Sequence, residues 1–139
     1  MIFAVIDTNV MVSALLGGLK SETNTSRIVE YIFAGKVTPV YNDKIINEYI
    51  EVLCRPRFGF DKTFVYQLIA YFKRVGLFTD RSKTDEYFSD KDDIVFYEVT
   101  LSHLNENEKT YLVTGNIRHF PIRSFVVTPT QFVEIVERI

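Results

Sequence analysis

Apolar runs along the chain alternate with stretches in which apolar residues recur every three or four positions. Ile2 to Ile6 is a continuous apolar run rich in β-branched residues, which predicts a strand that is buried on both faces of a parallel sheet. Residues 37–41 form a second run that contains Pro39. Because proline lacks an N–H group, Pro39 predicts that this run lies at an edge of the sheet or that the proline ends the strand. The further predicted strands are residues 37–41, 76–79, 110–116 and 124–129.

Six segments between and after these runs carry helical spacing. Several begin with residues that cap helices, as the run from Ser21 does, and two stop at glycine, after Leu16 and at Gly35. Strands that alternate with such helices imply βαβ units, a parallel sheet and helices on both faces. The predicted helices are residues 10–16, 21–35, 42–54, 62–75, 89–104 and 129–139.

Composition narrows the class of protein. At 139 residues and 47% hydrophobic content, the chain predicts a single domain over residues 1–139. Sixteen basic and 18 acidic residues nearly cancel, so any polyanion must be bound by a local patch. Cys54 is the only cysteine, which excludes an internal disulfide and agrees with a reducing compartment. With no predicted signal peptide or membrane span, we expect a cytoplasmic protein.

Polar residues follow two of the predicted strands directly. Asp7 follows the first strand, and Asn116 ends the TGN turn after the strand that starts at residue 110. Either residue alone is explained by ordinary turn or capping chemistry. In parallel sheets, however, ligands bind outside the carboxyl ends of the strands, where both of these residues are expected.

Further acidic residues lie on predicted helices. Glu48 falls just beyond the apolar arc of the helix at 42–54, so its carboxylate can lean toward a cleft at the edge of the core. Asp90, Asp92 and Asp93 begin the helix at 89–104, where carboxylates favour the positive end of the helix dipole. One aspartate is enough for a cap, so the cluster is only partly explained by capping.

The order of strand-end Asp, helical Glu, helix-start Asp and strand-end Asn resembles the PIN domain family over nearly the whole chain. VIDTNVMVSALL is similar to the first family motif, and LVTGNIRHFP is similar to the fourth. The resemblance implies a three-layer α/β/α sandwich with a central parallel sheet of four to five strands. It also implies a metal-dependent endoribonuclease. DTNVMVSALL, TGN and HFP are most similar to a prokaryotic branch of toxins from toxin-antitoxin systems.

The resemblance also implies roles for individual residues. Asp7, Glu48 and Asp93 match the three acidic positions, with Asp92 as an alternative to Asp93, and Asn116 stands where many relatives have Asp. These four residues are the predicted catalytic set, and the three carboxylates are the predicted metal ligands. The predicted supporting residues are Asn9, Ser13 and Thr114.

Three crowded carboxylates would repel one another unless a cation lay between them. Mg²⁺ or Mn²⁺ prefers such oxygen ligands and could neutralise a phosphodiester during hydrolysis. Asn116 offers a carbonyl oxygen without a charge, so both a one-metal and a two-metal site stay open.

Basic residues follow two of the acidic positions. Arg118, His119 and Arg123 come after the fourth motif and are predicted to contact RNA phosphates, and Arg55 and Arg57 follow the helix of Glu48. The toxin branch implies an antitoxin partner and a homodimer. The 12 Phe and 8 Tyr residues agree with an apolar patch for self-association.

Two other functions are consistent with parts of the pattern. A Mg²⁺-dependent phosphatase of the haloacid dehalogenase kind also begins with a strand-end Asp, but it requires a second Asp where Asn9 stands, and a later lysine in a matching context that the chain lacks. A catalytically weak or inactive PIN-like binding module is the other alternative, and the neutral Asn116 is the residue that favours it.

Overall fold

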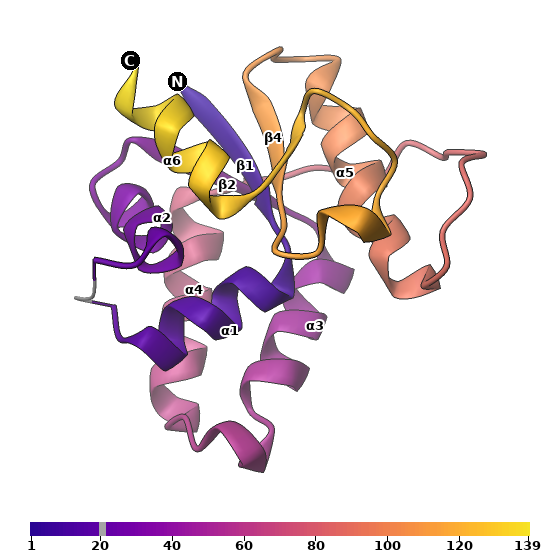
Figure 1. The fold of residues 1–139 in the computed structure, drawn as a ribbon. Helices are drawn as coiled ribbons and strands as arrows, with labels where there is room; N and C mark the ends of the chain where they lie inside the picture. Colours follow the sequence, from indigo (N-terminus) through magenta and orange to yellow (C-terminus); the bar gives the residue numbers. More distant parts are fainter. Residues whose placement is uncertain (20–21) are drawn as a thin grey trace.

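The computed structural model describes residues 1–19 and 22–139 and contains a five-stranded parallel sheet with helices on both faces (Figure 1). The strand order is β3-β2-β1-β4-β5, with every neighbouring pair parallel. This confirms the predicted three-layer architecture. The strands are β1 (Ile2–Ile6), β2 (Val37–Tyr41), β3 (Leu77–Phe78), β4 (Thr110–Val113) and β5 (Val126–Val127).

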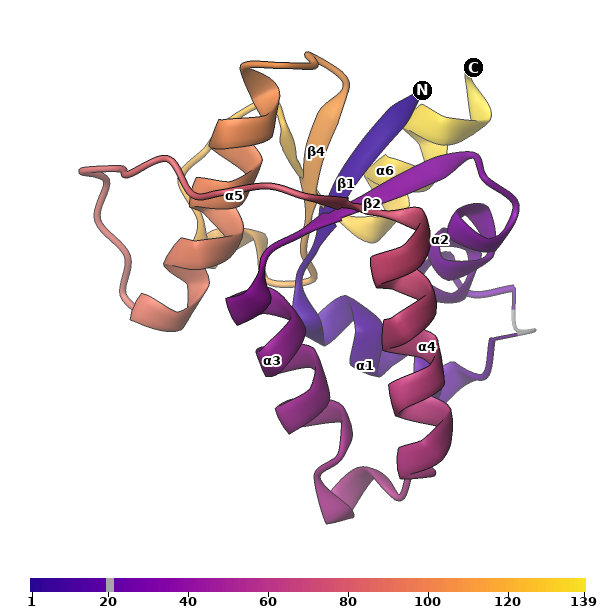
Figure 2. The same ribbon diagram turned by 180° about the vertical axis from the view of Figure 1, so that it is seen from behind.

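The helices divide between the two faces of this sheet. They are α1 (Thr8–Gly17), α2 (Asn24–Phe33), α3 (Asp43–Leu53), α4 (Lys62–Val75), α5 (Ile94–Leu104) and α6 (Pro129–Glu137). Helices α2 and α6 pack together on one face, and α4 and α5 cover the other, as the two opposite views show (Figures 1 and 2). None of the helices in the described part of the chain has the length and apolar character needed to cross a bilayer.

Most helix bounds follow the sequence pattern. Helix α4 has the predicted bounds, and α3 begins after Asn42, whose side chain accepts a hydrogen bond from the Ile45 N–H group at 2.9 Å. Helix α2 begins after Thr23, whereas the predicted start at Ser21 lies outside the described residues. The described residues also contain three short 3₁₀ turns, η1 (Pro56–Phe58), η2 (Lys91–Asp93) and η3 (Ile117–His119).

The position expected for Pro39 is wrong. Pro39 is the central residue of β2, and β2 lies between β1 and β3 rather than at an edge. The Tyr41 carbonyl accepts a hydrogen bond from Thr79 on the β3 side, so strand alternation directs the nitrogen of Pro39 to that side as well. Strand β3 starts only opposite Val40, so the missing N–H group leaves no ladder hydrogen bond unmade.

The topology brings two strand ends together. From β1 the chain builds the sheet outward through β2 and β3, and then returns to add β4 on the other side of β1. Ile6 pairs with Val113 at the carboxyl ends of β1 and β4. Such a reversal of strand order opens a crevice outside the strand ends, where doubly wound proteins bind ligands.

Candidate active site

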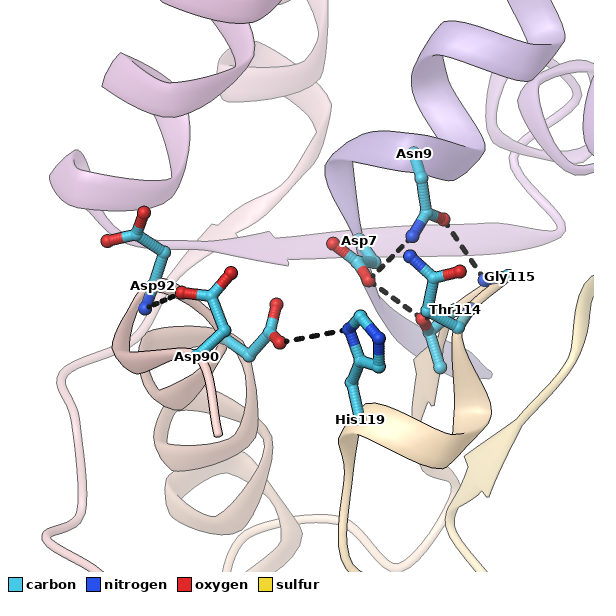
Figure 3. Close-up of polar contacts among 9 residues, drawn as sticks. Asp7, Asn9, Asp90, Asp92, Thr114, Gly115 and His119 are labelled. Carbon is cyan, nitrogen blue, oxygen red and sulfur yellow. Dashed lines mark hydrogen bonds and ion pairs between the residues drawn. The ribbon is translucent and has the colours of Figure 1, made fainter. Parts of the chain in front are cut away.

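Asp7 is fixed at the strand reversal by both its backbone and its side chain. Its N–H group donates to the Val113 carbonyl at 2.9 Å. The buried carboxylate accepts hydrogen bonds at Oδ2 from Thr114 Oγ1 at 2.7 Å and Asn9 Nδ2 at 3.1 Å (Figure 3). Asp7 precedes α1, yet its side chain makes no capping hydrogen bond. Helix capping therefore does not explain this carboxylate.

Asn9 connects Asp7 to the turn after β4. Its Oδ1 accepts a hydrogen bond from the Gly115 N–H group at 3.0 Å (Figure 3). A Cβ atom at position 115 would lie 3.2 Å from the same oxygen, so glycine permits this close approach. Thr114 Oγ1 also accepts from the Asn116 N–H group at 2.9 Å. The TGN turn and the start of α1 thus hold the Asp7 carboxylate in one orientation.

Glu48 approaches the same region from the middle of α3. The phenol of its neighbour Tyr49 is buried and donates to the Ile6 carbonyl, which anchors α3 to the end of β1. Thr8 Oγ1 donates to Glu48 Oε2. The half-buried glutamate is therefore connected to the residue that follows Asp7.

The third group of carboxylates comes from η2, just before α5. Asp90 Oδ1 accepts from the Asp92 N–H group at 2.9 Å, so Asp90 caps this turn. Asp93 is partly buried, and its Oδ2 is a buried atom without a hydrogen-bond partner among the described residues. His119 Nδ1 lies 3.5 Å from Oδ2, which is longer than an ordinary hydrogen bond.

These carboxylates share one pocket of about 350 Å³. In the view of Figure 3, Asp90 and Asp92 lie on the left, and Asp7 and Asn9 lie on the right, with His119 below Asp7. All four residues of the predicted catalytic set line this pocket, as does the alternative Asp92. The full lining consists of Asp7, Thr8, Asn9, Val12, Glu48, Val52, Arg57, Phe58, Asp90, Asp92, Asp93, Asn116 and His119.

Burial raises the pKa of each of the three main carboxyl groups. Desolvation is the largest cause in every case. The charge of Asp7 further raises the pKa values of Glu48 and Asp93, and the pKa of Asp93 reaches about 6. The hydrogen bond from Thr114 acts in the opposite direction on the pKa of Asp7. The pocket therefore disfavours its own negative charges when no cation balances them.

The donor set of the pocket fits a hard divalent cation. Its acidic lining supplies carboxylate oxygens, Asn116 adds an amide oxygen, and Asp93 Oδ2 is left without a partner. Among the described residues, no three His, Cys, Asp or Glu side chains are already grouped at metal-binding distance. The side chains would have to move closer together to ligate one ion.

Four predicted residues lie outside the pocket lining. Ser13 is exposed, and its hydroxyl lies 3.1 Å from that of Thr25. Arg118 and Arg123 line a separate cavity of about 750 Å³ beside β5 and α6, and Arg123 pairs there with Glu86. Thr114 lies beneath Asp7, fully buried. His119 is the member of the predicted RNA-contacting set that lines the acidic pocket.

Sequence reasoning did not assign a site role to Thr8 or Phe58, which also line the pocket. Thr8 stands between Asp7 and Asn9 in the first motif, and this position was an available signal. Phe58 belongs to the RPRFGF segment, which the sequence marked as the end of a helix, and Arg57 of this segment was named as a basic residue after the helix of Glu48.

Comparison with known proteins gives one family. A family model described as PIN domain matches residues 4–118, which include all of the predicted catalytic set. Neither curated proteins nor solved structures yielded a match.

Proposed function

The chain belongs to the PIN domain family, a family of nucleases that generally use divalent metals, and on this premise we propose that it is a metal-dependent endoribonuclease. The observation that carries the proposal is the acidic pocket at the strand reversal, in which carboxylates from three distant segments face one space. A purely structural role for these groups is disfavoured, because their repulsion costs stability and the contact between His119 and Asp93 offsets this cost only in part.

We assign the metal-holding role to Asp7, Glu48 and Asp93, with Asn116 as an uncharged oxygen donor. When bound, Mg²⁺ or Mn²⁺ would supply charge neutralisation for the phosphodiester and a more acidic water. Thr114 and Asn9 keep Oδ2 of Asp7 fixed, and Thr8 orients Glu48. His119 faces Asp93 at the mouth of the pocket and is suited to contact a phosphate of the substrate.

The proposed substrate is RNA. Arg118 and Arg123 lie in the cavity next to the pocket rather than inside it. We assign them contacts with phosphates farther along the strand, which would position the RNA without reading its sequence.

We infer further that the protein is the toxin of a toxin-antitoxin pair and forms a homodimer. The similarity of DTNVMVSALL, TGN and HFP to the toxin branch supports this role. Exposed apolar side chains such as Phe33, Leu77 and Phe78 agree with self-association. A purely monomeric sedimentation profile at micromolar concentration would contradict the dimer.

The test compares wild-type protein with Asp7→Asn. We expect wild type to cleave single-stranded RNA with Mg²⁺ or Mn²⁺ and to lose this activity in EDTA, and we expect Asp7→Asn to lose roughly 100-fold or more. Asp85→Asn, an exposed residue outside the pocket, is the matched control. Expression of wild type, but not of Asp7→Asn, should arrest growth. Activity that survives both EDTA and Asp7→Asn would falsify the proposal.

An inactive binding module is the second candidate, favoured by the neutral and exposed Asn116. The same assay separates the two. A binding module would retain RNA affinity and show no divalent-dependent cleavage in any of these samples.

A further inference from the structure

The turn that follows α3 forms one end of the acidic pocket. The pocket lining extends from Glu48 to Val52, four residues or about 6 Å along α3, and then to Arg57 and Phe58 of η1. One end of the pocket is thus acidic, and the other carries an arginine and an aromatic ring.

Local contacts give this turn a defined shape. The Phe58 N–H group donates to the Arg55 carbonyl, and the Gly59 N–H group donates to the Pro56 carbonyl, both at 3.1 Å. Gly59 has a φ of 68°, a left-handed conformation that glycine adopts without a steric cost. The side chain of Arg55 points to Glu51 on α3, with both carboxylate oxygens at 3.1 Å.

Arg57 differs from Arg55 in the contacts that its guanidinium makes. It is the only arginine or lysine among the described residues that line the pocket. Although five carboxylates share this lining, Arg57 makes no ion pair with any described residue. Its guanidinium lies instead over the Phe58 ring, 4.7 Å from the centroid. An exposed contact of this kind is weak, so the guanidinium stays available to an anion.

A second aromatic ring supports the ring of Phe58. Its ring stacks on that of Phe60 with centroids 5.6 Å apart and an interplanar angle of 13°. Phe60 is partly buried and packs against the core, whereas Phe58 is half-buried at the pocket. A half-buried ring that is supported from below and lines a pocket offers a surface on which a planar group can stack.

We propose that Arg57 and Phe58 form a nucleotide-binding platform, in which the Arg57 guanidinium leaves the Phe58 ring to contact a phosphate and an unpaired base of single-stranded RNA stacks on the face that it uncovers. This inference rests on the proposed function, because it extends the path of the RNA away from the acidic end of the pocket. Stacking on an aromatic or guanidinium plane tolerates any base, since every base has a π face. The platform therefore selects unpaired RNA over duplex RNA without selecting a sequence.

The test measures equilibrium binding of a fluorescent single-stranded RNA dodecamer and of an abasic oligomer with the same backbone, both in EDTA so that no strand is cut. The acidic end repels both oligomers equally, so their affinity ratio reports the bases alone. We expect wild type to prefer the base-containing strand by about 10-fold, and Phe58→Leu to lose this preference. Phe58→Tyr should retain the preference, and Phe64→Leu, an exposed aromatic on α4, is the matched control.

The arginine is tested through salt dependence. Arg57→Gln should reduce the slope of log affinity against log salt by about 0.7, the value for one phosphate contact on a single strand, and Arg57→Lys should retain the slope. Arg55→Gln, two residues away and paired with Glu51, is the matched control. Thermal melts of every variant establish that each one is folded.

The two proposals fail in different ways. Equal affinity of wild type for the two oligomers, no binding at all, or an unchanged preference in folded Phe58→Leu would overturn the platform, while metal-dependent cleavage that requires Asp7 would still support the nuclease. A preference that depends on Phe58 in a protein that never cleaves RNA would support the platform and overturn the nuclease.

Discussion

Asp93 is the residue at which the charge imbalance of the pocket is most evident. Burial and the charges of Asp7, Asp90 and Glu48 raise its pKa to about 6, although His119 acts against them. The folded protein therefore holds the Asp93 proton more tightly than the unfolded chain does. The free energy of unfolding therefore falls as the pH rises from 3.8, the ordinary pKa, to about 6. Above this pH Asp93 is charged in both states, and the whole destabilising effect of its charge in the folded protein is present.

We predict that Asp93→Asn stabilises the metal-free protein at pH 8 and that this effect fades as the pH falls below 4, where the carboxyl group becomes protonated in both states. Thermal melts in EDTA at the two pH values measure this difference. Asp85→Asn, exposed and outside the pocket, is the control. Equal effects of Asp93→Asn on the melting temperature at pH 8 and below pH 4 would show that the folded state does not disfavour the charge of Asp93.

A variant of Asn116 tests the effect of having asparagine where many relatives have Asp. It lines the pocket, so Asn116→Asp would add a carboxylate to the metal-binding end. We predict about 10-fold tighter Mn²⁺ binding by calorimetric titration, because each anion close to the cation adds attraction. Without metal, the same variant should have a lower melting temperature than wild type, and it should regain stability when Mn²⁺ is added.

The control for this variant is Asn107→Asp. Asn107 precedes β4 and therefore lies at the opposite end of that strand. If Asn116→Asp leaves both the affinity and the metal-dependent melting shift unchanged, residue 116 points away from the ion and acts only in the turn.

At the scale of elements, the long loop at 79–90 leads from β3 to η2 and has no regular structure of its own (Figure 1). It is held by Glu98, a buried carboxylate on the otherwise apolar α5. Glu98 accepts from Arg81 Nε and from the Thr84 N–H group, both at 2.8 Å. Because this loop ends at Asp90, Glu98 helps to place the acidic end of the pocket.

We predict that Glu98→Gln lowers the free energy of unfolding by about 2 kcal/mol, since it weakens a buried, charge-assisted pair. Urea unfolding gives the loss, and hydrogen exchange should increase within 79–90. Glu51→Gln, whose pair with Arg55 is exposed, is the matched control and should cost less than about 0.5 kcal/mol. Equal losses in the two variants would mean that Glu98 does not hold the loop.

The elements themselves were largely predictable, because their burial is periodic. Helix α4 has the predicted bounds for this reason. Turns were less predictable. In η3, with three residues per turn, neighbouring side chains point about 120° apart, so His119 lines the acidic pocket while Arg118 lines the next cavity. The contacts of Glu98 depend on a loop without periodicity, and only a charged residue in an apolar helix signalled them.

At the scale of the whole molecule, the parallel sheet and the strand ends at Asp7 and Asn116 could be expected from the order of apolar runs. The interior position of β2 could not, because Pro39 argues against it and is tolerated there only since β3 starts opposite Val40. The platform of Arg57 and Phe58 also required the structure, since only the path of α3 brings η1 to the pocket.

The pairing of β1 with β4 has a consequence for the order in which the protein acquires its site. The hydrogen bond between Thr114 and Asp7 connects residues 107 positions apart. During synthesis, Asp7 leaves the ribosome many seconds before Thr114, at about 5–20 residues per second. In that interval β1 has no β4 on which to pair, and such distant contacts form slowly. The nascent chain therefore carries its acidic residues unassembled, and the pocket closes only after β4 has emerged.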